Sequence, residues 1–155
     1  MTIKTPLLAT LGVLALASCA TRATMPFSTA TNCFYPACAI DVVVVEEGGV
    51  RKLKLANDGN VRMGTRHRLT AIVWNLQTPG YEFRSSSLQA KNSAWASQVI
   101  GHNWWFNSLS VTDLNTAPGV IRYEITVYPD RTVGGSPITA AGGIMNDPGP
   151  LAQRQ

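Results

Sequence analysis

The chain has 155 residues, of which 45% are hydrophobic and only 14% charged, and its formal net charge is +4. This length fits one domain that can bury a core of its own. The positive excess is too small to indicate a nucleic-acid-binding protein, because such proteins neutralise many phosphates.

The first predicted element is an N-terminal export signal, residues 1–18. Lys4 supplies its positive charge, and residues 6–16 form an apolar stretch that is too short to cross a bilayer of ~30 Å as a helix. The stretch runs into Leu-Ala-Ser-Cys at 16–19, which resembles the lipobox of bacterial lipoprotein signal peptides. That resemblance implies cleavage before Cys19 and acylation of this cysteine. The alternative is an ordinary secretory peptide with a cysteine near the cut.

Residues 19–32 follow as the lipidated cysteine and a flexible tether, because they are small, polar and weakly patterned. Acyl chains on Cys19 would anchor the protein to a membrane, since each buried methylene contributes about 0.8 kcal/mol. Ala20 stands where an aspartate would signal retention in the inner membrane. By resemblance to lipoproteins of Gram-negative bacteria, this implies sorting to the outer membrane, with the domain facing the periplasm rather than the cell surface.

Cys33 and Cys38 then form an even pair in an oxidising compartment. A turn at Pro36 would close the short loop between them, and a disulfide there would contribute about 2 kcal/mol. A zinc site would need two more ligands, for which only His67 and His102 are available. A redox pair favours a spacing of two residues. A structural disulfide is therefore predicted.

The domain itself, residues 33–155, has the two-residue period of β-strands, with turn signals about every ten residues. This pattern predicts a single all-β domain, a two-layer antiparallel β-sandwich with an irregular C-terminal tail. A central strand is expected at 68–76 and a strictly alternating one at 119–128. Further strands are expected at 39–45, 50–56, 81–83, 86–90, 109–113 and 138–141, and the only candidate for a helix is 93–100.

Two of these strands carry a resemblance to a known fold. The segments 72–74 (Ile-Val-Trp) and 118–125 (Pro-Gly-x-x-x-Tyr-x-Ile) resemble strands C and F of immunoglobulin-like domains. The resemblance covers residues 68–128 and implies an immunoglobulin-like sandwich in which Trp74 packs in the core. Ile121 stands where those domains place a corner tyrosine, and no cysteines bridge the two strands. The chain also resembles small bacterial envelope lipoproteins of uncharacterised function, which implies a class and no activity.

Positive charge is concentrated between residues 51 and 68, where six basic residues stand against Asp58 alone. A basic patch on a lipid-anchored domain would suit phospholipid head groups, lipopolysaccharide phosphates or an acidic protein. The alternative is a solvated sheet face, since basic side chains also protect edge strands from pairing. The six are Arg51, Lys52, Lys54, Arg62, Arg66 and Arg68, of which Arg62, Arg66 and Arg68 are the candidates for partner contact.

The densest aromatic cluster is Trp104, Trp105 and Phe106. Neighbours in a strand point to opposite faces, so these three rings cannot all be buried on one side. At least one is therefore expected to be exposed or covered by a partner, as in a protein interface or a stacking platform for sugars. The alternative is that Trp104 and Phe106 fill the core while Trp105 covers a sheet edge.

His102 is expected in a loop beside this cluster, and it is a further candidate for partner contact. The stretch 101–104 resembles the surroundings of a copper-binding histidine in azurin-like cupredoxins. A blue-copper site, however, needs a thiolate, a second imidazole and a weak axial ligand. No cysteine follows residue 38 and no histidine follows residue 102. No metal and no cofactor are therefore expected.

No catalytic motif is recognisable, because the nine carboxylates are scattered and neither histidine stands in a plausible triad. The sequence predicts a non-enzymatic, lipid-anchored envelope protein that binds a protein partner, as an accessory or assembly component of an envelope or secretion complex. One alternative is an inhibitor or immunity lipoprotein that inserts a loop such as 101–107 into an envelope-acting enzyme or toxin. The other is a glycan- or peptidoglycan-binding module that uses Trp104 and Trp105.

Overall fold

The computed structural model describes residues 30–34, 36–65 and 67–149. The predicted signal peptide, Cys19 and most of the tether lie outside the described residues. Within them, no helix is long and apolar enough to cross a membrane. The strands are β1 (Thr31–Cys33), β2 (Ala37–Glu47), β3 (Val50–Leu55), β4 (Asn60–Met63), β5 (Thr70–Leu76), β6 (Tyr81–Glu82), β7 (Leu88–Ala90), β8 (Val99–Trp105), β9 (Ser108–Asp113), β10 (Gly119–Pro129) and β11 (Ile138–Asn146), with a short helix α1 (Ala94–Gln98).

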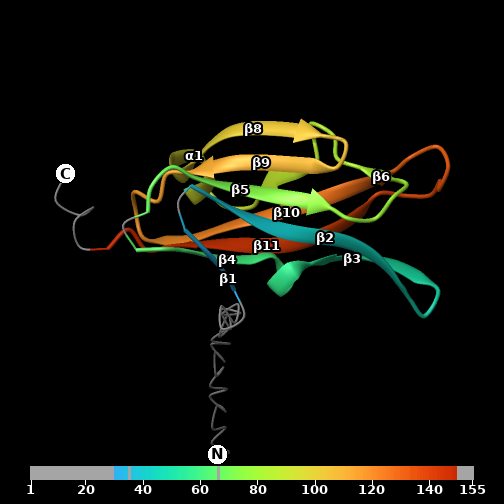
Figure 1. The fold of residues 1–155 in the computed structure, drawn as a ribbon, viewed down its shortest axis with the longest axis horizontal. Coiled ribbons are helices and arrows are strands. Elements are labelled where there is room, and N and C mark those ends of the chain that lie inside the picture. The colour runs from blue at the N-terminus through green and yellow to red at the C-terminus, as the bar shows by residue number, and fades with distance from the viewer. Residues whose placement is uncertain (1–29, 35, 66, 150–155) are drawn as a thin grey trace, which may run out of the picture.

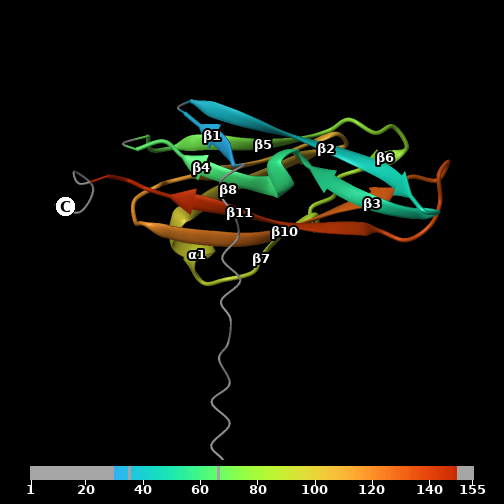
Figure 2. The same cartoon turned by 90° about the horizontal axis from the view of Figure 1, so that it is seen from below.

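The strands form two sheets that pack face to face around one core (Figures 1 and 2). One sheet has the order β3-β2-β5-β9-β8, and the other has the order β1-β4-β11-β10-β6, with β7 also paired to β10. The predicted two-layer all-β sandwich is confirmed. The predicted central strand is confirmed as well, because β5 is the middle strand of the first sheet.

Both sheets are mixed, so the prediction of an antiparallel sandwich is wrong for three of the strand pairs. The parallel pairs are β1 with β4, β4 with β11, and β2 with β5. After the β2–β3 hairpin the chain crosses to the other sheet, where it forms β4. It then returns to the first sheet as β5, which lies beside β2 and runs parallel to it. Such a crossover is what a parallel pair requires, and the alternation of side chains does not reveal it.

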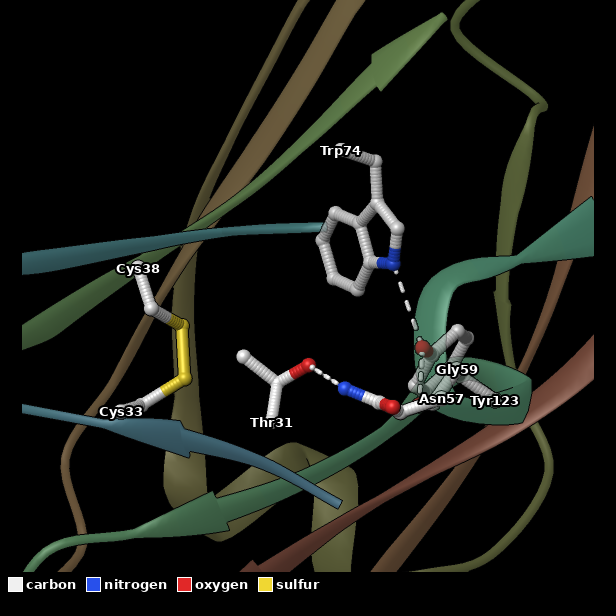
Figure 3. The surroundings of a disulfide bond; sticks show 7 residues. All are labelled: Thr31, Cys33, Cys38, Asn57, Gly59, Trp74 and Tyr123. Atoms are coloured by element: carbon white, nitrogen blue, oxygen red, sulfur yellow. Dashed lines mark hydrogen bonds between the residues drawn. A yellow bond between two sulfur atoms is a disulfide. The ribbon is translucent and has the colours of Figure 1, made fainter. Parts of the chain in front are cut away.

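The expected counterparts of strands C and F lie in opposite sheets. Strands C and F share a sheet in immunoglobulin domains, whereas here β5 and β10 face each other across the core, so that part of the resemblance is wrong. Trp74 and Tyr123 meet edge to face, with their ring centroids 5.2 Å apart. The indole N–H donates to the Tyr123 hydroxyl (3.2 Å), which donates in turn to the Gly59 carbonyl (2.6 Å; Figure 3). Trp74 does pack in the core, as expected.

The predicted disulfide between Cys33 and Cys38 is confirmed, with the two Cα atoms 5.1 Å apart. Cys33 belongs to β1 and Cys38 to β2, which lie in different sheets. The bond therefore ties the two layers together at the start of the domain (Figure 3).

The two ends of the domain are more regular than expected. Thr31 and Asn32, assigned to the tether, pair with β4 as part of β1. The last strand continues to Asn146, although the glycines at 142–143 suggested an irregular tail. Gly142 lies opposite Tyr123, and a Cβ at this position would collide with the tyrosine ring. The glycine therefore makes room for a core side chain and does not break the strand.

Candidate functional site

Trp104 and Trp105 of the aromatic cluster belong to β8, and Phe106 begins the turn after it. β8 is an edge strand of its sheet (Figure 1). Val99 is the one buried residue of this strand, and every residue after it is exposed. Trp104 is 48%, Trp105 73% and Phe106 76% exposed. The expectation of at least one exposed ring is confirmed, since all three rings are exposed. The alternative that Trp104 and Phe106 fill the core is wrong.

His102 also lies in β8, so its expected place in a loop is wrong. Residues 101–107, expected to form a protruding loop in an inhibitor, are likewise part of β8 up to Trp105, and a tight turn follows. The backbone N–H of Phe83 donates to the Phe106 carbonyl (2.8 Å), which holds this turn against the segment after β6.

The register with β9 tells which side of the sheet each ring occupies, because residues opposite each other share a face. Trp104 lies opposite Leu109, and His102 lies opposite Val111. Both partners on β9 are buried in the core, so Trp104 and His102 project from the inner face. They are nevertheless exposed, which means that the facing sheet does not extend beneath this part of β8.

The outer face of β8 carries two more large apolar side chains, Ile100 and Trp105. They lie opposite Thr112 and Ser108 of β9, and Ile100 is 49% exposed. The strand is therefore apolar on both faces and open along its free edge. We call this surface the β8 surface; it comprises Ile100, His102, Trp104, Trp105 and Phe106.

A hollow of about 330 Å³ adjoins the β8 surface. Its walls are partly apolar, and Arg84 adds a charged group to its rim. The Arg84 side chain donates a hydrogen bond to Glu82 (2.7 Å), and its guanidinium lies 4.5 Å from the centre of the Tyr128 ring. Such a hollow can take an apolar side chain or the face of a sugar ring. It is lined by Glu82, Phe83, Arg84, Ser85, Trp104, Trp105 and Phe106.

Two of the basic residues in the stretch 51–68 have an acidic partner from outside it. Lys52 and Lys54 of β3 both pair with Glu47 of β2, and the hydrogen bond from Lys54, followed by that from Lys52, lowers the pKa of Glu47 to about 2. The sequence did not indicate Glu47 as the partner of these lysines, because Glu47 lies just outside the basic stretch. Arg62 is exposed on β4 of the other sheet, and Arg68 is partly buried before β5. Arg66 lies outside the described residues.

One buried carboxyl group was missed as well. Asp113 is 0% exposed, and one of its oxygens accepts a hydrogen bond from Asn146 (3.1 Å). Burial raises the pKa of Asp113 to about 6. A signal was present in the sequence, since Asp113 continues the inward alternation of Leu109 and Val111. It lies at the end of the sandwich away from the aromatic turn, so it does not join the β8 surface.

The described residues contain no group of three or more His, Cys, Asp or Glu side chains that could hold a metal ion. Compared with protein-family models and with curated proteins, the chain matches none of them.

Proposed function

We propose that this chain is a lipid-anchored, non-catalytic protein of the bacterial outer membrane that binds a protein partner through the β8 surface. The anchor rests on the lipobox-like sequence at Cys19. The binding role rests on one observation above all, the exposure of three consecutive aromatic side chains at the end of an edge strand and in the turn that follows it.

Exposed aromatic rings at this density support a role in protein recognition. Trp and Tyr, with Arg, carry most of the binding energy in protein interfaces, and contiguous exposed apolar patches on soluble domains mark interaction sites. Trp104 and Trp105 project from opposite faces of β8, so a partner that contacts both rings has to reach both sides of the strand. A protein can do so, whereas a single sugar ring covers one aromatic face.

Glycan binding is the second candidate, and the hollow beside the β8 surface is the observation that favours it. Aromatic walls next to Arg84, Glu82 and Ser85 would combine stacking with hydrogen bonds to hydroxyl groups. In this case the Trp105→Ala variant would lose retention on isolated peptidoglycan while its thermal stability stays unchanged.

The anchor is tested by fractionating cells that express Cys19→Ser. We expect this variant to leave the membrane fraction, because the acylated thiol would be missing. A variant that stays bound to the membrane as firmly as the unchanged chain would refute lipidation.

The partner is tested by photo-cross-linking in intact cells, with a photoreactive residue in place of Trp105. The matched control carries it in place of Val50, which is 59% exposed on β3 at the opposite edge of the same sheet. We expect a discrete protein adduct from position 105 and none from position 50. Equal labelling from both positions, or none from either, would contradict the proposal.

A further inference from the structure

The edge strands of the described chain differ in how they are protected from pairing with another strand. β1, β6 and β7 are at most three residues long, and β3 carries Arg51, Lys52 and Lys54. Short length and basic side chains are two of the devices that keep sheet edges from aggregating. β8 is seven residues long and contains no Asp, Glu, Lys or Arg. Its free edge is therefore the one that can accept a further strand.

The regular part of this edge begins at His102, directly after Gly101. A bulge interrupts the pairing with β9 between Ile100 and His102, and Gly101 has a φ of 66°. From His102 to Trp105 the pairing is regular again, so the backbone groups on the other side of these residues form a regular, open edge. A short antiparallel strand can bind there by main-chain hydrogen bonds, as in β-augmentation.

We propose that the occupant is a second copy of this chain, with β8 of one copy pairing antiparallel to β8 of the other around a two-fold axis at Asn103. The two five-stranded sheets would then become one continuous sheet of ten strands. This inference rests on the proposed function, because it takes the β8 surface as a protein-binding surface and names the partner.

The strand is complementary to itself in this register. Trp105 of one copy reaches the bulged Gly101 of the other, just beyond the regular edge, where open space beside the glycine leaves room for an indole ring. Trp104 lies opposite His102 on the inner face, and the two side chains already stand close within one strand, with their ring centroids 5.8 Å apart. Aromatic cross-strand pairs, including a ring opposite an edge glycine, are among the contacts that stabilise sheets.

Charge also favours a second copy at this edge over the opposite one. β8 carries no Asp, Glu, Lys or Arg that pairing with β8 would bring together, whereas pairing of β3 with β3 would bring the basic side chains of two copies close to one another. Anchoring would help further, since chains held in one membrane meet at a raised effective concentration.

The test uses two opposite charges at the proposed axis. Asn103 is exposed and lies opposite Ser110, so Asn103→Lys and Asn103→Glu leave the core untouched. We expect the mature chain in detergent to sediment as a dimer, and each variant alone to have a dissociation constant higher by about fivefold or more. An equimolar mixture of the two variants should restore the dimer, because Lys then faces Glu. The control Val50→Lys, at the opposite edge, should leave the dimer unchanged.

A cysteine at the same position gives a second readout in intact cells. Oxidation should link Asn103→Cys into a dimer across the two-fold axis. It should not link Ser110→Cys, which faces the same side of the sheet one strand further from the edge.

A monomeric wild-type chain, or a mixture of the charged variants that fails to dimerise, would overturn the inference. If position 105 still cross-links to a different envelope protein in that case, the proposed function stands and only the identity of the partner is wrong. If position 105 captures nothing and the chain is monomeric, both fail.

Discussion

The buried carboxyl group of Asp113 is expected to make the stability of the fold depend on pH. Its pKa is raised from 3.8 to about 6, chiefly because burial disfavours the charged form. The folded state therefore holds a proton at pH values where the unfolded chain has released it. Lowering the pH through 6 towards 3.8 stabilises the fold, and raising it through the same range removes that stability.

The magnitude follows from the two pKa values of Asp113. Each pKa unit corresponds to 1.36 kcal/mol, so the full difference between 3.8 and about 6 is worth about 3 kcal/mol. Between pH 7.5 and pH 5 the linkage relation gives a gain of about 1.4 kcal/mol in the free energy of unfolding. Glu47 acts in the opposite sense, since its pKa is lowered from 4.5 to about 2, but its contribution is lost only below this window.

The matched variant is Asp113→Asn, which keeps the size of the side chain and an oxygen that can still accept from Asn146. Urea unfolding followed by tryptophan fluorescence would be measured for both proteins at pH 7.5 and pH 5. We expect the wild type to gain about 1.4 kcal/mol more than the variant, because the two proteins differ only in the carboxyl group of Asp113. The same change in both proteins would refute the reasoning.

Tyr123→Phe should destabilise the fold by about 1–3 kcal/mol, because the buried N–H of Trp74 loses its acceptor. Thermal unfolding would measure this, and Tyr128→Phe, which removes an exposed hydroxyl, should change the melting temperature little. Replacing Cys33 and Cys38 together by serine should cost about 2 kcal/mol, the entropy of closing their short loop. Equal urea midpoints for the oxidised protein and the double variant would contradict this.

Much of the core could be predicted from the sequence. The strict alternation at 119–128 predicted that Ile121, Tyr123, Ile125 and Val127 share one face, and all four are buried. The pairing of Cys33 with Cys38 followed from their count and spacing. These features depend on neighbours in the chain, which a single sequence displays.

The candidate site was predicted only in part. The aromatic residues at 104–106 stand out in the sequence, but their exposure depends on where the facing sheet ends. The pairing of Lys52 and Lys54 with Glu47 likewise depends on the β2–β3 register, which moves charges outside the basic stretch next to it.

The sequence by itself determined which side chains face inward along a strictly alternating strand such as β10, because the two-residue period of a strand separates its two faces locally. Only the tertiary structure decided which sheet each strand joins, that β5 runs parallel to β2, and that β8 is an uncovered edge. Those properties arise from pairings between distant segments, and several arrangements bury the same inward faces equally well. The partner-binding proposals therefore rest on the edge that the fold leaves open.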